Sequence, residues 1–333
     1  MTAAGRASLI ACATAAMTAL SGCAGIQSAL DPKGVEAREI GFLFWTVTGI
    51  SVAVTLMVVV ALGAAIYGPP AWRRRLAAHE TIVAAGIALP IVVLSGLLIY
   101  GLVVMEAGAA RSRAAEGPGV TIVGKQWWWR VVYHGPDGSE VVSANELRLP
   151  VGEAVALRLE TEDVIHSFWA PTLGGKLDMI PGRTNVLTVE ATEPAVSRAQ
   201  CAEYCGGAHA LMSMNVVAME PEAYRDWLAA EAQPAATPES DIERRGQQLF
   251  QDYGCGACHT IRGTDAAGVA GPDLTHVGSR HSLAAATLPN DAQAFARWIA
   301  DNQHIKPDNL MPPYDMLGGR DLAAMAAYLD GLE

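Results

Sequence analysis

Cysteines are scarce in this sequence, and the few present leave no pair for a structural disulfide. There are six, at positions 12, 23, 201, 205, 255 and 258. Four of them belong to two short metal-binding strings, Cys201 to Met212 and Cys255 to His259, and Cys12 lies in an apolar leader. The sequence also lacks a basic surplus, because 23 lysines and arginines accompany 34 acidic residues. We therefore expect neither a disulfide scaffold nor a nucleic-acid partner.

Charged residues are absent from two long apolar stretches. Ile40 to Tyr67 and Thr81 to Met105 span 28 and 25 residues without one, and each is long enough to cross a hydrocarbon core of about 30 Å. The connector Gly68 to Glu80 contains three arginines, which favours a cytoplasmic location, although two arginines beyond the second stretch weaken that asymmetry. We expect two transmembrane helices, the second kinked at Pro90.

The N-terminal segment predicts export and lipid attachment. Arg6 precedes a short apolar run that ends in the string Leu20-Ser-Gly-Cys23, with a cysteine directly after a small-residue cleavage site. The string resembles the lipobox of bacterial lipoproteins, in which residues 1–22 are removed and Cys23 becomes a lipid-bearing N-terminus outside the inner membrane. An ordinary secretory leader with an incidental Cys23 is the alternative. If the N-terminus lies on the outer side of the inner membrane, the two transmembrane helices place all residues after Met105 on that side as well.

The string Cys201-Ala-Glu-Tyr-Cys205-Gly-Gly-Ala-His209-Ala-Leu-Met212 offers two thiolates, an imidazole and a thioether within twelve residues. Soft ligands of this kind select copper. A disulfide between the two cysteines is the alternative, but it would not need a histidine and a methionine at the next ligand-like intervals. Two thiolates can bridge two coppers, and each copper then needs an imidazole and a weak axial ligand. His166, far back in the sequence, is the candidate for the second imidazole.

From Val120 to about Tyr224 the chain consists of short alternating apolar runs bounded by Gly, Pro, Asn and Asp. Regular short strands with turn signals predict an all-β sandwich with Greek-key connections. Such a scaffold presents ligands from loops at one end, where His166 could meet the Cys201 string. The expected strands are Val120 to Val123, Trp127 to Tyr133, Glu140 to Ser143, Ala154 to Glu160, Asn185 to Glu190 and Met214 to Met219.

A Pro- and Ala-rich linker, Ala229 to Ser240, predicts a new domain that begins with a helix at Asp241. This domain contains Cys255-Gly-Ala-Cys258-His259, the covalent attachment sequence of a c-type haem. The two thiols can bond the two vinyl groups of one haem while His259 ligates the iron. Two such cysteines alone could also form a redox pair or half of a zinc site. The directly following histidine, the exported location and the lack of a second cysteine pair favour haem.

Four segments together resemble subunit II of haem-copper cytochrome c oxidases. They are Lys125 to Trp129 (Lys-Gln-Trp-Trp-Trp), Glu162 to Ser167, Leu173 to Asn185 and Cys201 to Met212, and they follow the two apolar stretches in the right order. The resemblance implies a cupredoxin domain that holds the dinuclear copper centre CuA. The implied ligands are Cys201 and Cys205 as bridges, His166 and His209 as caps, and Met212 and the backbone carbonyl of Glu203 as axial ligands.

The same resemblance implies roles for residues around the copper centre. In the family the carboxylate at Glu203 points away from copper and helps to bind magnesium at the boundary with subunit I; a hydrogen bond within the loop is the alternative. Trp127 resembles the exposed tryptophan at which electrons enter, whereas Trp128 and Trp129 are expected to fill the core. Glu80 resembles the mouth of a proton path. Its spacing to the following proline is longer than usual, so a solvated carboxylate at a helix start is an equal alternative.

The C-terminal domain resembles class I cytochromes c. Asn309 to Tyr314 (Asn-Leu-Met-Pro-Pro-Tyr) resembles their Met-Pro segment, which implies that Met311 is the sixth iron ligand. A methionine ligand raises the haem potential, which suits a carrier that feeds electrons to copper. The resemblance also implies that Pro272 backs the axial histidine and that Arg280 meets a haem propionate.

Taken with the motifs, the resemblance implies subunit II of a bacterial respiratory cytochrome c oxidase with a fused cytochrome c domain. Electrons would pass from an external donor to haem c, to CuA and on to subunit I, where oxygen is reduced; this chain has no residues for that oxygen chemistry. The implied partners are subunits I and III, the inner membrane, and cytochrome c or quinol–cytochrome c reductase as the donor. The domain Asp241 to Glu333 has 12 acidic and 7 basic residues, a net charge of −5, which suggests an electropositive donor. Glu162 and Asp163 resemble docking acids on the copper domain.

Two other functions stay open. A nitric oxide reductase that carries CuA could use the same electron-accepting subunit, and the sequence of the neighbouring catalytic chain would decide. A membrane-anchored copper carrier is disfavoured, because it would need neither a c-type haem nor the segment Lys176 to Arg183.

The expected architecture is therefore multidomain, with the N-terminus and both C-terminal domains on the periplasmic side. Its segments are a lipoprotein-type signal peptide (1–22), a periplasmic segment (23–39), two transmembrane helices (40–67 and 81–105) joined by a cytoplasmic loop (68–80), a CuA cupredoxin domain (106–228), a linker (229–240) and an all-α cytochrome c domain (241–333).

Overall fold

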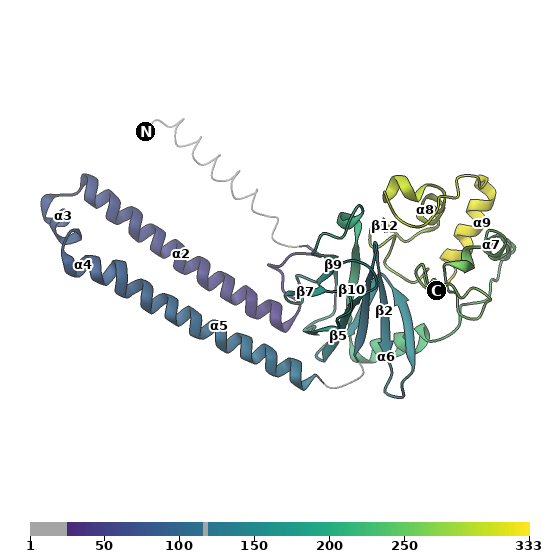
Figure 1. The fold of residues 1–333 in the computed structure, drawn as a ribbon, viewed down its shortest axis with the longest axis horizontal. Coiled ribbons are helices and arrows are strands. Elements are labelled where there is room, and N and C mark those ends of the chain that lie inside the picture. The colour runs from purple at the N-terminus through teal and green to yellow at the C-terminus, as the bar shows by residue number, and fades with distance from the viewer. Residues whose placement is uncertain (1–24, 116–118) are drawn as a thin grey trace, which may run out of the picture. The chain divides into compact units, whose positions relative to one another are not determined.

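The computed structural model describes residues 25–115 and 119–333. The predicted signal peptide and the lipidation site Cys23 lie outside these residues. The chain divides into two compact units, one formed by Arg38–Ala114 and the other by the chain on either side of it. Figure 1 shows long helices in the first unit and, in the second, strands followed by shorter helices.

The first unit is built from long apolar helices. Two segments are long and apolar enough to span a membrane, Val35–Tyr67 and His79–Ser112. Large apolar side chains on them are exposed, for example Val60 at 69% and Leu94 at 64%, which marks a surface made for lipid or for another protein. In chain order the elements are α2 (Val35–Tyr67), α3 (Pro70–Leu76), α4 (His79–Val83), a π-helical turn (Ala84–Ala88) and α5 (Leu89–Ala114).

The π-helical turn lies directly before the proline at which a kink is predicted. Pro90 has no backbone N–H, and its ring crowds the carbonyl group four residues earlier, that of Gly86. The turn at Ala84–Ala88 contains that carbonyl, and a wider turn relieves the crowding. The helix thus continues through Pro90 after a local change in its hydrogen-bond pattern.

The second unit contains a sandwich of two five-stranded sheets, so the predicted all-β class of this region is confirmed. One sheet has the order β3-β2-β1-β5-β8 and the other β4-β10-β9-β6-β7. The parallel pairs β1 with β5 and β4 with β10 require connections that cross between the sheets. The strands are β1 (Val120–Lys125), β2 (Trp128–His134), β3 (Glu140–Ala144), β4 (Glu146–Pro150), β5 (Ala154–Thr161), β6 (His166–Trp169), β7 (Lys176–Met179), β8 (Asn185–Glu190), β9 (Ala195–Cys201) and β10 (Ser213–Met219).

Alternating side chains of the two sheets form the core of the sandwich. Leu157 and Leu159 on β5 are fully buried, whereas Arg158 between them is not. Trp129 from one sheet and Phe168 from the other meet edge-on, with ring centroids 6.1 Å apart. The predicted core role of Trp129 is therefore confirmed, and its edge-on contact is a favourable aromatic geometry.

Asn145 turns the chain from the first sheet into the second, between β3 and β4. Its φ is 60°, a left-handed conformation that asparagine tolerates better than most residues. Its Oδ1 accepts a hydrogen bond from the Trp129 N–H at 2.9 Å, and its own N–H donates to the Trp129 carbonyl at 2.9 Å. This paired contact fixes the corner in register with β2.

The C-terminal domain consists of α-helices joined by long loops, as predicted. Ser240 and Glu243 form a capping box at the start of the first helix. Gly246 lies where that helix packs on the last one, and a Cβ on it would overlap the carbonyl oxygen of Ala324. Glycine is therefore required for the close crossing. The elements are α7 (Asp241–Asp252), a 3-10 turn (Cys255–Ala257), the short strands β11 (Ser282–Leu283) and β12 (Leu288–Pro289), α8 (Ala292–Ile305) and α9 (Gly319–Asp330).

The segment that connects the sandwich to the C-terminal domain is held in place. Helix α6 (Pro221–Glu231) extends into the predicted linker. Beyond it, the Ala235 N–H donates to the Arg262 carbonyl at 2.9 Å, and His276 Nε2 lies 3.1 Å from the Gln233 carbonyl oxygen. His276 is only 7% exposed, so this turn histidine anchors the linker.

The C-terminal domain also contacts the sandwich directly. His281 donates from both its backbone N–H (2.8 Å) and its Nδ1 (2.9 Å) to Glu146 Oε2. Glu146, at the start of β4, is 4% exposed. Further hydrogen bonds across this contact are Arg262 Nη1 to the Val142 carbonyl (3.0 Å), Arg148 Nη2 to the Ser279 carbonyl (3.3 Å), Asn215 Nδ2 to Ser282 Oγ (2.8 Å) and Arg198 Nη2 to the Ala286 carbonyl (2.9 Å). The two domains are thus packed together as well as tethered.

Candidate copper and haem sites

The fold brings the predicted copper ligands together from separate elements. His166 begins β6, Cys201 ends β9 and Cys205 lies in the loop that follows. Their ligand atoms lie within 4.8 Å of one another, and all three residues are buried. The two sulfur atoms are 3.7 Å apart. A metal ion bonded to both at about 2.3 Å fits between them, as bridging requires.

The remaining predicted ligands complete this cluster around the two sulfurs. His209 Nδ1 is 3.4 Å from Cys205 Sγ, and Met212 Sδ is 3.8 Å from the same atom. The backbone oxygen of Glu203 lies 3.1 Å from Cys201 Sγ. Two thiols, two imidazoles, a thioether and a carbonyl form the soft, mixed donor set that suits copper. The residues present therefore fit the predicted CuA centre.

A carboxylate orients the first imidazole of the cluster. Asp163 Oδ1 lies 2.7 Å from His166 Nε2, and Asp163 Oδ2 also accepts a hydrogen bond from the Gln126 N–H at 2.7 Å. A carboxylate can only accept, so Nε2 donates to it, and Nδ1 is the nitrogen that faces Cys201 Sγ, 3.7 Å away. Asp163 is thus a supporting residue of the copper cluster, a role that its prediction as a docking acid missed.

The thiols lie where one of them readily loses its proton. The hydrogen bond between Cys201 and Cys205 lowers the pKa of Cys201 and raises that of Cys205. Burial disfavours the charged form of His166, but its hydrogen bonds with Cys201 and Asp163 outweigh burial and raise its pKa. Because thiolates are the metal-binding form of cysteine, the lowered pKa of Cys201 prepares this residue to bind a metal.

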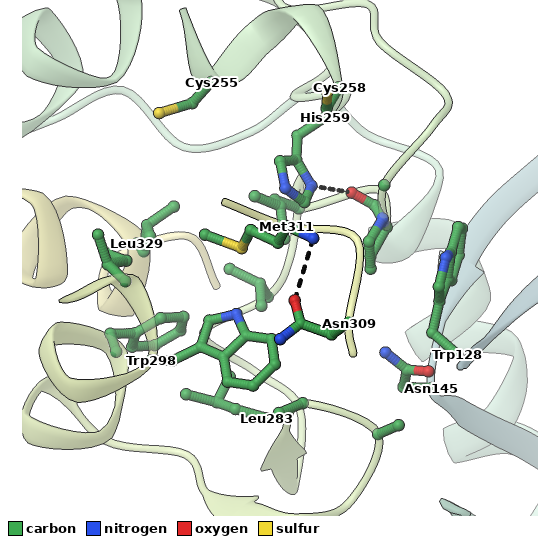
Figure 2. Close-up of a pocket in the computed structure, with 18 of the residues that line it drawn as sticks. Trp128, Asn145, Cys255, Cys258, His259, Leu283, Trp298, Asn309, Met311 and Leu329 are labelled. Carbon is green, nitrogen blue, oxygen red and sulfur yellow. Dashed lines mark hydrogen bonds between the residues drawn. The ribbon is translucent and has the colours of Figure 1, made fainter. Parts of the chain in front are cut away.

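The second site is a cavity of about 280 Å³ in the C-terminal domain. Figure 2 shows His259 and Met311 projecting into it, with Trp128 and Asn145 of the sandwich at its side. Both cysteines of the haem attachment sequence line it, and most of its wall is apolar, as a flat porphyrin requires. The apolar wall includes Phe250, Leu274, Phe295, Trp298, Ile299 and Leu329.

His259 is prepared to ligate iron. Its Nδ1 lies 2.8 Å from the carbonyl oxygen of Pro272, which can only accept, so the proton is on Nδ1 and the Nε2 lone pair remains for the metal. Burial, with a smaller contribution from the charge of Arg280, lowers the pKa of His259. The ring is therefore neutral at pH 7, which is the metal-binding form. The predicted backing role of Pro272 corresponds to this hydrogen bond.

Hydrogen bonds hold the loop that carries Met311. Its N–H donates to Asn309 Oδ1 at 3.0 Å, and its carbonyl accepts from Gln303 Nε2 at 3.0 Å. Two other methionines follow in the sequence: Met316 is 67% exposed, and Met325 is buried at 1% in α9. Met311 points into the cavity with His259, so the geometry supports it as the sixth ligand.

Arg280 lines the cavity and is itself nearly buried. It is 8% exposed, and one Nη donates to the Asp273 carbonyl at 2.7 Å. Its Nε is buried with no hydrogen-bond partner among the described residues. A buried guanidinium charge is costly, and an anionic propionate of a bound haem would stabilise it.

The tryptophans next to the copper loop differ from expectation. Trp127 is only 7% exposed, so the expected exposed position is wrong, although its role in electron transfer stays a prediction. Its indole N–H donates to the Cys205 carbonyl at 3.0 Å. Trp128, expected in the core, lines the haem cavity instead and lies under the Lys125 ammonium, 5.2 Å from the ring centroid.

Comparisons with known proteins agree with both sites. A family model described as cytochrome c oxidase subunit II, periplasmic domain, matches residues 119–219, and one described as cytochrome c matches residues 243–333. A cytochrome c oxidase subunit 2 of Alkalihalophilus pseudofirmus is 31% identical over 326 residues, 94% of either chain. One of Bacillus subtilis is 29% identical over 260 residues, 74% of this chain and 72% of that one.

Among solved structures, the chain is similar to the periplasmic domain of subunit II of cytochrome oxidase of Bradyrhizobium japonicum. The two are 29% identical, and the match covers 34% of this chain and 91% of that one, with a TM-score of 0.32.

Proposed function

This chain belongs to the cytochrome c oxidase subunit 2 family and carries a fused cytochrome c domain, and we propose that it conducts electrons through haem c and then a dinuclear CuA centre to subunit I. It is a subunit of a membrane haem-copper oxidase. The observation that carries the proposal is the cluster of two thiols, two imidazoles and a thioether. Each imidazole nitrogen and the thioether sulfur lies less than 4 Å from the Sγ atom of Cys201 or Cys205, and the two Sγ atoms are equally close to each other. Oxygen reduction is assigned to subunit I.

The residues of the copper cluster would hold two copper ions with little freedom to move. Cys201 and Cys205 would bridge, His166 and His209 would cap, and Met212 with the Glu203 carbonyl would complete the axial positions. Bound copper supplies a one-electron acceptor and donor of low reorganisation. Asp163 fixes the His166 ring, and the strands β6 and β9 fix the backbone on both sides, so the ligand positions need not change when an electron arrives.

In the C-terminal domain, Cys255 and Cys258 would bind the haem covalently, and His259 and Met311 would ligate its iron. Bound haem c supplies a second one-electron carrier, whose potential the methionine raises. Arg280 would pair with a propionate. Leu310, 81% exposed beside the cavity, offers an apolar contact to an external donor, and the net charge of −5 favours an electropositive one.

The remaining assignments concern the surroundings of the subunit. The two candidate membrane helices would anchor it in the inner membrane, with the lipidated Cys23 and both electron-transfer domains on the periplasmic side. The Glu203 carboxylate is proposed as a magnesium ligand at the contact with subunit I, since its backbone carbonyl already faces the copper cluster. The donor is proposed to be cytochrome c or quinol–cytochrome c reductase, and subunit III completes the complex.

The variant Cys205→Ser tests the order of this path in the purified complex. Removing one bridging thiolate should abolish the copper pair while leaving the covalent haem c intact. In stopped-flow measurements haem c should be reduced at the normal rate, and the haem of subunit I should stall. Met214→Leu is the matched control, because Met214 is fully buried in the core two residues from a ligand. Onward transfer at the wild-type rate in Cys205→Ser would show that copper does not lie between haem c and subunit I.

A further inference from the structure

We propose that Lys306 is a positioning residue that locks the haem-ligand loop, residues 306–311, against the copper loop, residues 205–209. The proposal rests on the proposed function, because it takes Met311 as an iron ligand and Cys205 as a copper ligand. It goes further by assigning the place where the two domains are coupled. The evidence is a continuous chain of hydrogen bonds between these two ligands.

Lys306 is the only lysine among residues 241–333, and it is buried at the domain contact. It follows the end of α8 and is 3% exposed. Its Nζ donates to the Trp127 carbonyl across the contact at 2.6 Å and to the Ala284 carbonyl of its own domain at 3.3 Å. No carboxylate of the described residues forms an ion pair with it. Burying an amine that is held only by carbonyl oxygens is costly, most of all in its charged form, so its position calls for a role other than stability.

From Trp127 the chain of hydrogen bonds continues to the copper loop. The Trp127 indole N–H donates to the Cys205 carbonyl at 3.0 Å, and the Gln126 side-chain amide donates to the same oxygen at 2.8 Å. The Cys205 carbonyl is therefore held from two sides, by Trp127, which Lys306 contacts, and by the neighbouring Gln126. Displacing Trp127 would move the backbone of a copper ligand.

In the other direction the chain of hydrogen bonds reaches the iron ligand. The Lys306 carbonyl accepts a hydrogen bond from Asn309 Nδ2 at 2.8 Å. Asn309 Oδ1 in turn accepts from the Met311 N–H at 3.0 Å. Asn302, fully buried, accepts from the same Asn309 amide at 3.2 Å through both its backbone and side-chain oxygens. Lys306 thus fixes one end of a loop whose other end carries Met311.

A second close contact lies beside this chain of hydrogen bonds. Asp308 packs on Gly207 of the copper loop, where an added Cβ would overlap the Asp308 carboxylate and lie 3.0 Å from its Cβ. Asp308 has a φ of 64°, a conformation that non-glycine residues rarely adopt. The Asp308 side chain of the haem-ligand loop therefore packs directly on the backbone of the copper loop.

These contacts define a route for one electron between the domains. One carrier is oxidised by one electron, the other is reduced by one, and no bond or proton changes. Burial lowers the pKa of Lys306 to about 7, and both of its protonation states retain N–H donors for the two carbonyls. The contribution of Lys306 is to hold the two loops at a fixed separation.

Lys306→Met in the purified oxidase complex tests this role, because methionine keeps much of the volume and removes the donors. Amide exchange of residues 126–129 and 205–209 should become about tenfold faster, the change expected for losing hydrogen bonds from a buried charged donor. Transfer from haem c to copper, measured after flash reduction, should slow. Copper content, the haem c spectrum and reduction of haem c by an external donor should stay unchanged.

Lys125→Met is the matched control, because Lys125 Nζ also crosses the contact, to the Val269 carbonyl at 3.3 Å, but from an exposed edge where it pairs with Glu162. It should change exchange at residues 126–129 and 205–209 by much less. If Lys306→Met does not assemble, Lys306→Leu, a smaller apolar side chain that likewise lacks the donors, is judged by the same measurements. Wild-type exchange and wild-type transfer in the Lys306 variant would overturn the proposal. The proposed function fails separately, through onward transfer in Cys205→Ser.

Discussion

The copper and haem regions of this subunit are built in opposite ways. The copper ligands come from β6, β9 and the loop before β10, and their atoms contact one another directly. In the C-terminal domain His259 and Met311 instead face a cavity of about 280 Å³ among apolar side chains. The ligands of the copper site therefore all come from the sandwich, whereas a bound haem would form the centre of the helical core.

Preventing haem attachment should have the largest effect, and it should destabilise the haem region without destabilising the copper region. In the double variant C255S/C258S, a cavity of about 280 Å³ would lack its haem, and losing the packing of even one large apolar group in a core costs about 2–5 kcal/mol. A domain is stable by only about 5–15 kcal/mol. The C-terminal domain should therefore unfold while the sandwich stays folded. Limited proteolysis and amide exchange of α7 and α9 would measure this.

The double variant C201S/C205S is the counterpart for the copper region. It should lose copper but keep protease resistance in both domains, because the sandwich core does not depend on the metal. If amide exchange of α7 and α9 were equally slow in the wild type and in C255S/C258S, the haem domain would not need its cofactor to fold. The two regions would then not differ in their dependence on a bound group.

Copper affinity should fall moderately when the orientation of His166 is lost. Asp163→Ala removes the carboxylate that holds Nε2, and loss of such a supporting hydrogen bond lowers metal affinity about 10–100-fold. Copper retention under increasing chelator concentration would measure it. The neighbouring Glu162→Ala serves as the control, because Glu162 is half-exposed and pairs only with Lys125 among the described residues. Equal copper retention in the two variants would show that Asp163 does not support the site.

The smallest expected effect concerns the ion pair between His281 of the C-terminal domain and Glu146 of the sandwich. The hydrogen bond to Glu146 raises the pKa of His281, against burial and the charge of Arg148. Burial opposes the charge of Glu146, but hydrogen bonds from His281 and the charge of Arg148 outweigh it and lower its pKa. A raised histidine pKa gives stability that is present below the ordinary value of 6.5 and is lost as pH rises through the folded value.

Domain contact should therefore loosen slightly as the pH rises above 6.5, by less than about 1 kcal/mol because His281 is partly exposed. Amide exchange at residues 279–283, corrected for the intrinsic effect of pH, would show it. In His281→Gln the exchange should become independent of pH over this range. An unchanged pH dependence in that variant would assign the effect to another group.

Strands with large alternating apolar residues were predictable, and strands with small or polar inward residues were not. In β9 the buried inward positions include Ser197 and Ala199, which give almost no hydrophobic periodicity. β6 has only four residues, and three consecutive ones, His166 to Phe168, are buried, so alternation is absent. β4 and β7 are similarly short, and β4 follows β3 after the single corner residue Asn145.

Residues that contact the other domain could not be predicted from local pattern. Trp127 is a large aromatic at the edge of a sandwich, and it is buried by the sandwich core and the copper loop on one side and contacted by Lys306 of the haem domain on the other. Lys306 follows an amphipathic helix as a surface lysine would. His281 has no ligand spacing, and its partner Glu146 lies 135 residues away. No periodicity within one segment carries information about such pairs.

The sequence alone determined the chemistry of this protein, because donor type and short-range spacing are written in single segments: Cys201 to Met212 for copper, Cys255 to His259 for haem, and two uncharged apolar stretches for a membrane. The tertiary structure decided how these parts are coupled. It placed His166 beside Cys201, Lys306 on Trp127 and Asp308 on Gly207. The physical reason is that burial and hydrogen-bond geometry between distant segments arise only when whole domains pack together.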